Sequence, residues 1–323
     1  DPAALGRLSK YADTLTFEFE SIPPHALRLA ADRFERVRPG VASLLAAADR
    51  LDERRALQAV GIRVAPFAPV DRESDLPGAI ETVGLPAILK RRTGGYDGKG
   101  QTSLNSADQA ADAWAAIGRS PAILERRIDF VRELSVVVCR SEHGATARYP
   151  IVENEHRSGI LVRSTAPAVV STELARVAGD WATGLADSLG HIGVLTLELF
   201  ETPQGLIANE FAPRVHNSGH WTIEGAAVSQ FENHARAVLG LPLGPTDAVS
   251  CCVMQNLIGS VPDRAEVLAV AGARLHDYRK AAKRGRKVGH ITCSGPTPAA
   301  AAAVADQIET RTPRDGYTWS APP

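Results

Sequence analysis

Alternation of apolar and polar residues predicts strands along much of the chain. Residues 14–20 (TLTFEFE) alternate at every position, and Pro23 and Pro24 end the run. Residues 193–200 and 205–212 are two further runs, and the turn sequence Thr-Pro-Gln-Gly between them predicts a β-hairpin. Shorter apolar runs predict other extended segments at 62–70, 85–90, 101–104, 122–130, 133–140, 251–259 and 287–293.

Apolar residues at helical spacing predict helices between these strands. One helix covers 43–60, with Asp49 as a possible cap inside it and Gly61 as its stop. The other helices are expected at 107–118, 171–190 and 297–311. Helices and strands that alternate in this way indicate an α/β or α+β protein with several lobes, and not a helical bundle or a β-sandwich.

Composition narrows the class of protein. The net charge of the 323-residue chain is -1, which argues against a general binder of nucleic acid. No apolar run approaches the ~20 residues of a membrane helix, so we expect no membrane partner. The four cysteines show no C-x-x-C spacing, which fits neither a zinc knuckle nor a disulfide framework and favours a reducing cytoplasm.

The segment KRRTGGYDGKGQ (90–101) is a candidate phosphate-binding loop. Lysine is scarce in this chain, so the two lysines of the segment point to chemistry. Gly94 and Gly98 are too close together for the loop that opens a helix in P-loop proteins, and a glycine follows Lys99. Strand-like residues flank the segment, so we expect a hairpin flap whose backbone amides close over phosphate. The alternative is a plain surface hairpin.

A pair of glutamates on the 193–212 hairpin is a candidate magnesium site. Glu198 and Glu210 lie almost symmetrically about Gln204, so they should be directly opposite or one step offset. Two carboxylates so close repel each other unless a cation lies between them, and Asn209 adds a neutral oxygen. In the alternative register, one glutamate points to solvent. Flap and hairpin together indicate Mg-ATP and phosphoryl transfer.

Two other patterns have simpler interpretations. His216 and His220 have the i, i+4 spacing of a helical metal pair, but Pro213 and the intervening Asn-Ser-Gly predict a loop, which disfavours zinc. The basic segment KAAKRGRKVGH (280–290) alone would be a solvated loop or a nucleic-acid patch. The near-neutral net charge favours a site for a single phosphate instead.

Four segments together resemble the ATP-grasp ligases, and among them the 5-(carboxyamino)imidazole ribonucleotide synthases of purine synthesis. They are LPAILKRRTGGYDGKGQ, LERRIDFVRELSVVV, LTLELFETPQGLIANEFAPRVHNSGHWT and KVGHIT. The resemblance implies an ATP-grasp fold with a Rossmann-like N-terminal domain and a small C-terminal domain. It implies carboxylation of aminoimidazole ribonucleotide by ATP and bicarbonate through carboxyphosphate, with magnesium, in a homodimer.

The resemblance also implies roles for individual residues. The expected ATP-binding residues are Arg50, Lys90, Gly95, Tyr96, Asp97, Gly98, Lys99, Gly100, Gln101, Glu125, Arg126, Arg127, Ile128, Glu133, His156, Asn209 and Glu210. The expected ribotide-binding residues are Tyr96, Asp97, Arg214, Asn217, Lys280, Arg286 and Lys287. Arg214, His216 and Asn217 are the expected catalytic residues, and Glu198 and Glu210 the expected metal ligands.

The resemblance sets expected domain boundaries and leaves two other functions open. A partial Rossmann-like domain would cover 1–42, because the glycine-rich opening of the family pattern is absent. The large ATP-grasp lobe would cover 43–83 and 148–250, the lid lobe 84–147, and the C-terminal domain 251–323. The alternatives are a related ligase, such as formate-dependent glycinamide ribonucleotide transformylase, and a truncated, non-catalytic nucleotide-binding module.

Overall fold

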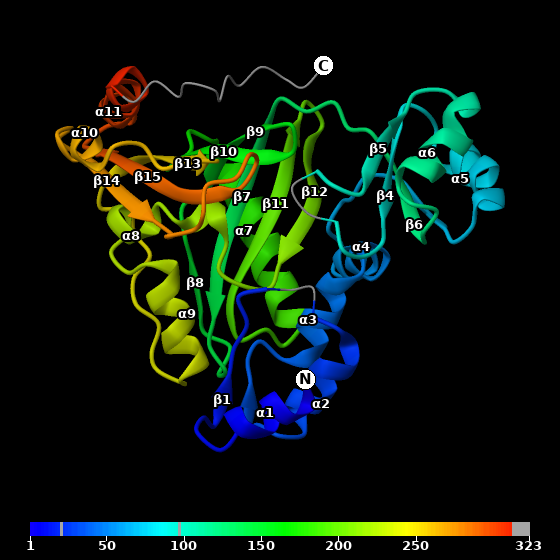
Figure 1. Cartoon of the computed structure of the whole chain (residues 1–323), viewed down its shortest axis with the longest axis horizontal. Coiled ribbons are helices and arrows are strands. Elements are labelled where there is room, and N and C mark those ends of the chain that lie inside the picture. The colour runs from blue at the N-terminus through cyan, green and yellow to red at the C-terminus, as the bar shows by residue number, and fades with distance from the viewer. Residues whose placement is uncertain (20–21, 96–97, 312–323) are drawn as a thin grey trace.

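Two antiparallel sheets of unequal size form the body of the protein (Figure 1). The structure is a computed structural model that describes residues 1–19, 22–95 and 98–311. The larger sheet has nine strands and the smaller has four. The structure therefore confirms the mixed α/β class and the separate lobes that the alternating pattern predicts.

The nine-stranded sheet runs through the centre of the molecule, and all of its strand pairs are antiparallel. Its spatial order is β12 (Gly205–Ala212), β11 (Gly193–Thr202), β7 (Arg132–Arg140), β9 (Val152–Arg157), β10 (Ile160–Ala166), β13 (Cys251–Ile258), β15 (Lys287–Gly295) and β14 (Ala273–Asp277), with β8 (Thr146–Arg148) beside β7. The predicted C-terminal strands thus do not form a sheet of their own, because β13 pairs with β10.

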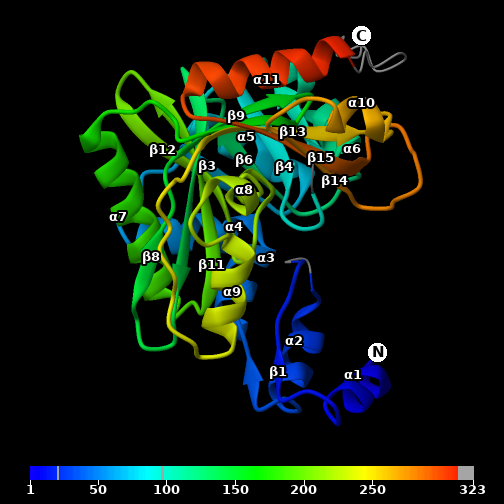
Figure 2. The same cartoon turned by 90° about the vertical axis from the view of Figure 1, so that its left-hand side faces the viewer.

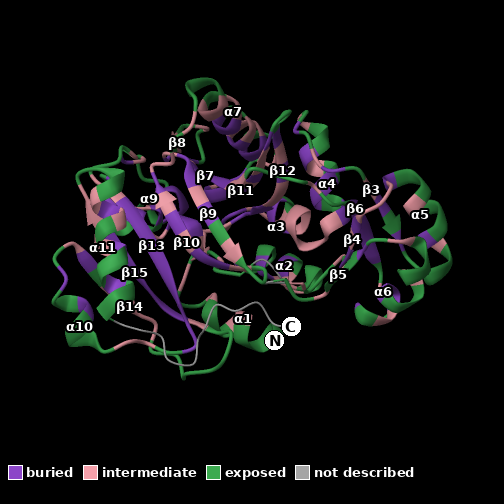
Figure 3. Ribbon diagram, turned by 90° about the horizontal axis from the view of Figure 1, so that it is seen from above, coloured by how far each residue is buried: buried purple, intermediate pink, exposed green. Residues whose placement is uncertain are grey.

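Helices cover both faces of this sheet. Alternate residues of β7 and β11 belong to two different hydrophobic clusters, as expected for strands buried on both faces. One face packs on α7 (Thr172–Ser188) and α4 (Arg50–Ala59). The other packs on α8 (Thr222–Gly225) and α9 (Gln230–Val238). Figure 3 shows the strands buried and the outer sides of the helices exposed.

Two helices cover the C-terminal part of the large sheet. These are α10 (Arg264–Leu268) and α11 (Pro298–Arg311), and their apolar residues form one cluster with those of β13 and β15. Figure 2 shows α11 lying across one end of the molecule, far from the N-terminal segment. The alanine-rich composition of α11 suits this position, because small side chains allow a helix to approach the sheet closely.

The small sheet has the order β3 (Phe67–Val70), β6 (Ala122–Arg126), β4 (Ala87–Arg91) and β5 (Gln101–Leu104). Its core is shared with α5 (Leu76–Val83) and α6 (Ala110–Ala116). The short 3₁₀ turns η1 (Glu73–Asp75) and η2 (Ala107–Gln109) lead into these two helices.

The expected lobe boundaries differ from this arrangement. The sequence expectation assigned 67–83 to the large lobe, but β3 pairs with β6 and α5 packs in the core of the small sheet. It also assigned 127–147 to the lid, but β7 pairs with β9 and β11 of the large sheet. Both differences arise because strand pairing is decided by partners distant in sequence.

The N-terminal segment contains α1 (Pro2–Leu8), β1 (Thr14–Leu15), α2 (Pro24–Ala31), β2 (Arg36–Val37) and α3 (Val41–Ala48). Of the predicted strand at 14–20, only Thr14 and Leu15 pair, because the parallel partner β2 has two residues; position 20 lies outside the described residues. None of the described helices has the length and apolar character needed to span a membrane.

The predicted helix at 43–60 is two helices. Asp49 has an extended backbone and ends α3, and its side chain accepts a hydrogen bond from the Leu51 amide at the start of α4. Asp49 also pairs with Arg92, next to the flap. The break therefore orients α4 toward the space between the two sheets.

Candidate functional site

Two contiguous cavities lie between the small sheet and the large sheet. The larger has a volume of about 610 Å³ and the smaller about 450 Å³. Ile88, Lys90, Phe200 and Asn209 line both cavities. The predicted residues that line the larger one are Arg50, Gly95, Gly98, Gln101, Glu133, His156, Glu198, Glu210, Arg214, His216, Asn217 and Lys287. The fold thus brings most of the predicted site residues together.

The glycine-rich segment forms the predicted flap. Lys90 pairs with Gln101 across the β4–β5 hairpin, so the loop between them is the hairpin tip. Gly94, Gly98 and Gly100 have φ values between 73° and 75°, where glycine is favoured. A Cβ on Gly98 would lie 3.3 Å from the Ser158 carbonyl oxygen, which shows that the tip lies against the β9–β10 turn. Tyr96 and Asp97 lie outside the described residues.

A buried carboxylate organises two cations at the root of the flap. Glu125 Oε2 lies 2.5 Å from Lys90 Nζ, and its Oε1 accepts from Arg54 Nε at 2.5 Å. Burial opposes ionisation of Glu125, but Arg54 and Lys90 outweigh it and hold the pKa of Glu125 well below its usual range. The Lys90 ammonium therefore has a fixed position at the boundary of the two cavities.

The two glutamates of the β11–β12 hairpin face each other as predicted. Glu198 pairs directly with Glu210, and a β-bulge follows, so that Leu199 pairs with Ala208 and Asn209 is the extra residue. Arg50 Nη1 lies 2.9 Å from Glu210 Oε2, and His216 Nε2 lies 3.0 Å from Glu198 Oε1. Burial would raise the pKa of Glu210, but Arg50 lowers it to about 2.

This pair fits a magnesium ion. Among the described residues no group of three or more histidine, cysteine, aspartate or glutamate side chains could hold a metal ion alone. Magnesium is commonly held by one or two carboxylates together with substrate phosphates. Glu198 and Glu210, which line the same cavity as the flap residues, would supply the protein part of such a site.

Glu53 and Arg54 belong to the site but are not among the predicted residues. They are 3% and 1% exposed, and Glu53 accepts from the Phe211 amide and from Arg54. Burial raises the pKa of Glu53 to about 7, with Arg54 opposing and Glu210 adding to the rise. The available signal was their position on the same helix as Arg50, one turn further along.

The smaller cavity is lined by charged side chains and by two aromatic rings. Arg126, Arg127 and Ile128 line it, together with the Glu125 side chain. Phe130 and Phe200 stack on one another at its edge, with ring centroids 4.6 Å apart and an interplanar angle of 10°. The sequence prediction missed both phenylalanines, which come from the β6–β7 loop and from β11.

Of the remaining predicted residues, Glu133, His156 and Asn217 line the larger cavity, whereas Lys280 and Arg286 do not. Glu133 contacts the His156 ring across β7 and β9; burial alone would lower the pKa of His156, but Glu133 raises it. Asn217 exchanges two hydrogen bonds with the Asn256 side chain, of 3.0 and 2.6 Å. Lys280 and Arg286 are exposed on the β14–β15 loop and line neither cavity.

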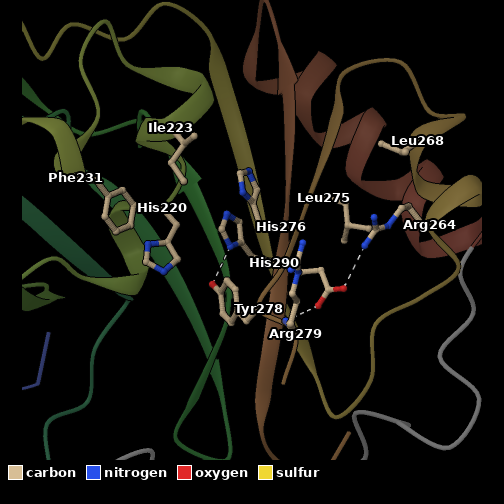
Figure 4. Close-up of a pocket in the computed structure, with 11 residues that line it drawn as sticks. His220, Ile223, Phe231, Arg264, Leu268, Leu275, His276, Tyr278, Arg279 and His290 are labelled. Carbon is tan, nitrogen blue, oxygen red and sulfur yellow. Dashed lines mark hydrogen bonds and ion pairs between the residues drawn. The ribbon is translucent and has the colours of Figure 1, made fainter. Parts of the chain in front are cut away.

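A separate cavity of about 500 Å³ lies beside the C-terminal strands (Figure 4). His220, His276, His290 and Tyr278 gather on one side of it, and Tyr278 Oη lies 2.8 Å from His290 Nδ1. Burial lowers the pKa of His220 to about 3. His216 and His220 thus line different cavities.

Two family models match the chain. The model described as "ATP-grasp domain" matches residues 55–231, and the one described as "Phosphoribosylaminoimidazole carboxylase C-terminal domain" matches residues 252–304.

Curated relatives and solved structures are similar over nearly the whole chain. The N5-carboxyaminoimidazole ribonucleotide synthase of Pseudomonas aeruginosa is 48% identical, covering 90% of this chain and 80% of the relative. The synthetase structure from Thermus thermophilus has a TM-score of 0.92 at 43% identity, covering 98% and 87%. The synthase structure from Aspergillus clavatus, in complex with ADP and 5-aminoimidazole ribonucleotide, has a TM-score of 0.88 at 30% identity, covering 96% and 85%.

Proposed function

The chain belongs to the N5-carboxyaminoimidazole ribonucleotide synthases of the ATP-grasp family, and we propose that it carboxylates the exocyclic amine of 5-aminoimidazole ribonucleotide with ATP and bicarbonate. The observation that carries this proposal is the opposed pair Glu198 and Glu210, which faces Lys90 and the glycine flap across one cavity. Two facing carboxylates destabilise a sheet, so their presence in this hairpin points to a bound cation and phosphate.

We infer that ATP spans the two cavities. The smaller cavity, beside Phe130 and Phe200, accepts the adenine ring, and the backbone of 125–128 provides its polar edge contacts. Glu133 and His156 line the wall where the ribose would lie. Lys90, with its position fixed by Glu125, reaches the phosphates, and the flap residues 95–101 cover them.

We propose that Glu198 and Glu210 hold Mg²⁺, with Asn209 beside them. When bound, the ion neutralises the charge that develops on the transferring phosphoryl group. Arg50 already neutralises Glu210, so it is placed to exchange this contact for one with a phosphate oxygen. The pKa of Glu53 is raised to about 7, so at pH values below this its carboxyl is mostly protonated and adds no full negative charge beside Glu198 and Glu210.

We infer two chemical steps in the larger cavity. A bicarbonate oxygen attacks the terminal phosphorus of ATP, the bond to ADP breaks, and carboxyphosphate forms. The amine nitrogen then bonds to the carboxyl carbon, the bond from carbon to the phosphate oxygen breaks, and the nitrogen loses a proton. Arg214 and Lys287 line the wall where these anions would lie, which favours binding of carboxyphosphate.

We propose that Lys280, Arg286 and Lys287 bind the phosphate of the ribotide. Lys287 lies at the cavity, whereas Lys280 and Arg286 reach it only if the β14–β15 loop turns inward. Tyr96 and Asp97 are proposed to face the imidazole ring.

We propose lobe boundaries that follow the sheets. The lid covers 67–126, and the large lobe covers 43–66 and 127–250, with 251–311 as its C-terminal extension. The four free cysteines favour a reducing cytoplasm. Family resemblance favours a homodimer, which sedimentation velocity tests directly.

Phosphate release from ATP, with Mg²⁺ and bicarbonate, tests the reaction. We expect 5-aminoimidazole ribonucleotide to stimulate release, and glycinamide ribonucleotide with formate to have no effect. Release without stimulation would retain the nucleotide site and contradict the proposed acceptor. Stimulation by glycinamide ribonucleotide would favour the related transformylase.

Glu210→Ala tests the metal site. We expect it to reduce ribotide-stimulated phosphate release to background while the protein remains folded by circular dichroism. Glu201→Ala is the matched control, since Glu201 lies on the same hairpin, pairs with Arg132 and lines neither cavity. It should retain turnover. Equal turnover in the two variants would remove Glu210 from the metal site.

A further inference from the structure

A chain of buried polar side chains crosses the large sheet beneath Glu198. Ser135 pairs with Glu198 across β7 and β11, and Ser164 pairs with Asn154 across β9 and β10. Asn154 lies two residues beyond the partner of Ser135 on β9, so all four side chains lie on one face of the sheet.

Hydrogen bonds join these residues in one direction. Ser164 Oγ donates to Asn154 Oδ1 at 2.7 Å, and Asn154 Nδ2 donates to Ser135 Oγ at 2.9 Å. Ser135 Oγ then donates to Ser218 Oγ at 2.8 Å. Because Ser218 Oγ accepts this bond, its own proton is free to point at His216 Nδ1, which lies 2.9 Å away.

A second donor independently requires His216 Nδ1 to be an acceptor. The Ser218 backbone amide donates to the same nitrogen at 3.3 Å, and a backbone N–H cannot reverse its role. On the other side of the ring, Nε2 lies 3.0 Å from Glu198 Oε1, and a carboxylate can only accept. Both contacts are satisfied by one tautomer, with the proton on Nε2.

The backbone of His216 is also clamped. Gln230, which is fully buried, accepts from the His216 amide at 3.0 Å and donates to its carbonyl at 2.7 Å. A Cβ on Gly219 would lie 2.6 Å from Gln230 Oε1, so a glycine is needed there for this clamp to form. The ring therefore has little freedom in position or rotation.

We propose that the chain Ser164–Asn154–Ser135–Ser218 is a positioning device that fixes the Nε2-protonated tautomer of His216 and aims its N–H at Glu198. A buried polar chain is costly unless every member is satisfied, and an apolar sheet face would be simpler to build. The result is an oriented Glu198 carboxylate, in which the oxygen toward His216 is occupied and the other oxygen is left for a cation. The use of Glu198 as a metal ligand rests on the proposed function; the tautomer does not.

The tautomer can be read directly in solution. Long-range ¹H–¹⁵N correlation spectra of the ¹⁵N-histidine-labelled chain report which ring nitrogen carries the proton, and His216→Asn identifies the His216 signal by its loss. We expect Nε2 protonated in the wild type, with no substrate or metal added. A proton on Nδ1 overturns the proposal. This reading stands even if the chain fails to carboxylate the ribotide.

Two variants test the chain itself. Ser218→Ala removes the hydroxyl donor, and Ser135→Ala leaves Ser218 free to rotate. In both variants the residue 218 amide still donates to Nδ1, at 3.3 Å, and Glu198 still accepts from Nε2, so we expect the Nε2 tautomer to remain the major form with a detectable Nδ1-protonated fraction. We expect a fall of about tenfold in kcat for Ser218→Ala, with the KM for ATP changing less than kcat. Thr196→Val is the control: Thr196 is buried two residues before Glu198, and its hydroxyl has no partner in the described part of the chain. It should change neither tautomer nor kcat.

The results for the serine variants distinguish a positioning role of the hydrogen-bonded chain from a role in the stability of the fold alone. Lower thermal stability with an unchanged tautomer and kcat in both serine variants would make the chain structural only and overturn the proposal. Mixed tautomers together with no carboxylation by the wild type would sustain the positioning role and reject the proposed function. If a variant fails to fold, the wild-type spectrum still decides the tautomer.

Discussion

At the scale of single residues, the site is built on buried charges that neutralise one another. Glu125 holds Lys90 and Arg54, and Arg54 also contacts Glu53. A buried ion pair contributes little net stability, because desolvation offsets most of the attraction, but removal of one partner is costly. The arrangement therefore fixes the Lys90 ammonium at the boundary of the two cavities.

Glu125→Gln should show this cost. The amide keeps the shape of the side chain but leaves Lys90 without its counter-charge and Arg54 with Glu53 as its remaining partner, so we expect a loss of about 3–5 kcal/mol in the free energy of unfolding. Urea denaturation measures it. Glu81→Gln on the exposed side of α5 is the control and should change stability by less than about 0.5 kcal/mol. Equal losses in the two variants would contradict the neutralising role of Glu125.

At the scale of elements, two hairpins meet at the cavity. The β4–β5 hairpin carries the flap, and the β11–β12 hairpin carries the two glutamates. The bulge at Asn209 decides the second register: in a regular ladder continued from the Leu199–Ala208 pair, Glu198 would pair with Asn209 and not with Glu210. The flap tip in turn lies on the β9–β10 turn, so the small sheet touches the large one above the cavity.

Gly98→Ala should weaken this closure. Gly98 has φ +73°, which costs an L-residue about 1–2 kcal/mol, and the added Cβ presses on Ser158 and Gly159. We expect the KM for ATP to rise about tenfold, since ~1.4 kcal/mol is a factor of ten. Gly61→Ala is a matched control with φ +74° and open space at its Cβ. A rise in KM for both variants would contradict a specific role of the flap tip.

At the scale of the whole molecule, buried neutral histidines join distant segments. His234 Nε2 lies 2.9 Å from the Oγ1 atom of Thr16, the residue that follows β1. His234 Nδ1 accepts a hydrogen bond from the Val194 amide. His191 lies 2.8 Å from Ser43 of α3 and donates to the Val194 carbonyl. Burial lowers the pKa of His191 to about 3 and that of His234 to about 4. These contacts hold the N-terminal segment on the large sheet.

Acidification should therefore destabilise the protein. Below pH ~6.5 the unfolded chain binds protons at these histidines and the folded chain does not. Their contribution to the free energy of unfolding is therefore fully present above pH ~6.5. It falls toward pH ~4 by up to about 1.4 kcal/mol per pH unit for each histidine. Urea midpoints at several pH values measure the slope. His191→Gln should reduce it, whereas His25→Gln, at an exposed position, should not. A slope unchanged by His191→Gln would contradict this account.

The sequence by itself determined the local features of this protein. The hairpin nature of the flap and the closeness of Glu198 to Glu210, to within one step of the ladder, depend on residues close together in the chain, where turn residues and alternation carry the information. The short motifs also identified the family, through their resemblance to the ATP-grasp ligases.

Only the tertiary structure decided the contacts between distant segments. β3 joins the small sheet, Glu53 and Arg54 enter the site, and Phe130 stacks on Phe200 through pairings that no local pattern encodes. Ser135 and Ser164 are ordinary strand residues in the sequence, and only the strand order brings them into the hydrogen-bonded chain that leads to His216. The physical reason is that strand order and register are set by burial of whole faces, which depends on the complete chain.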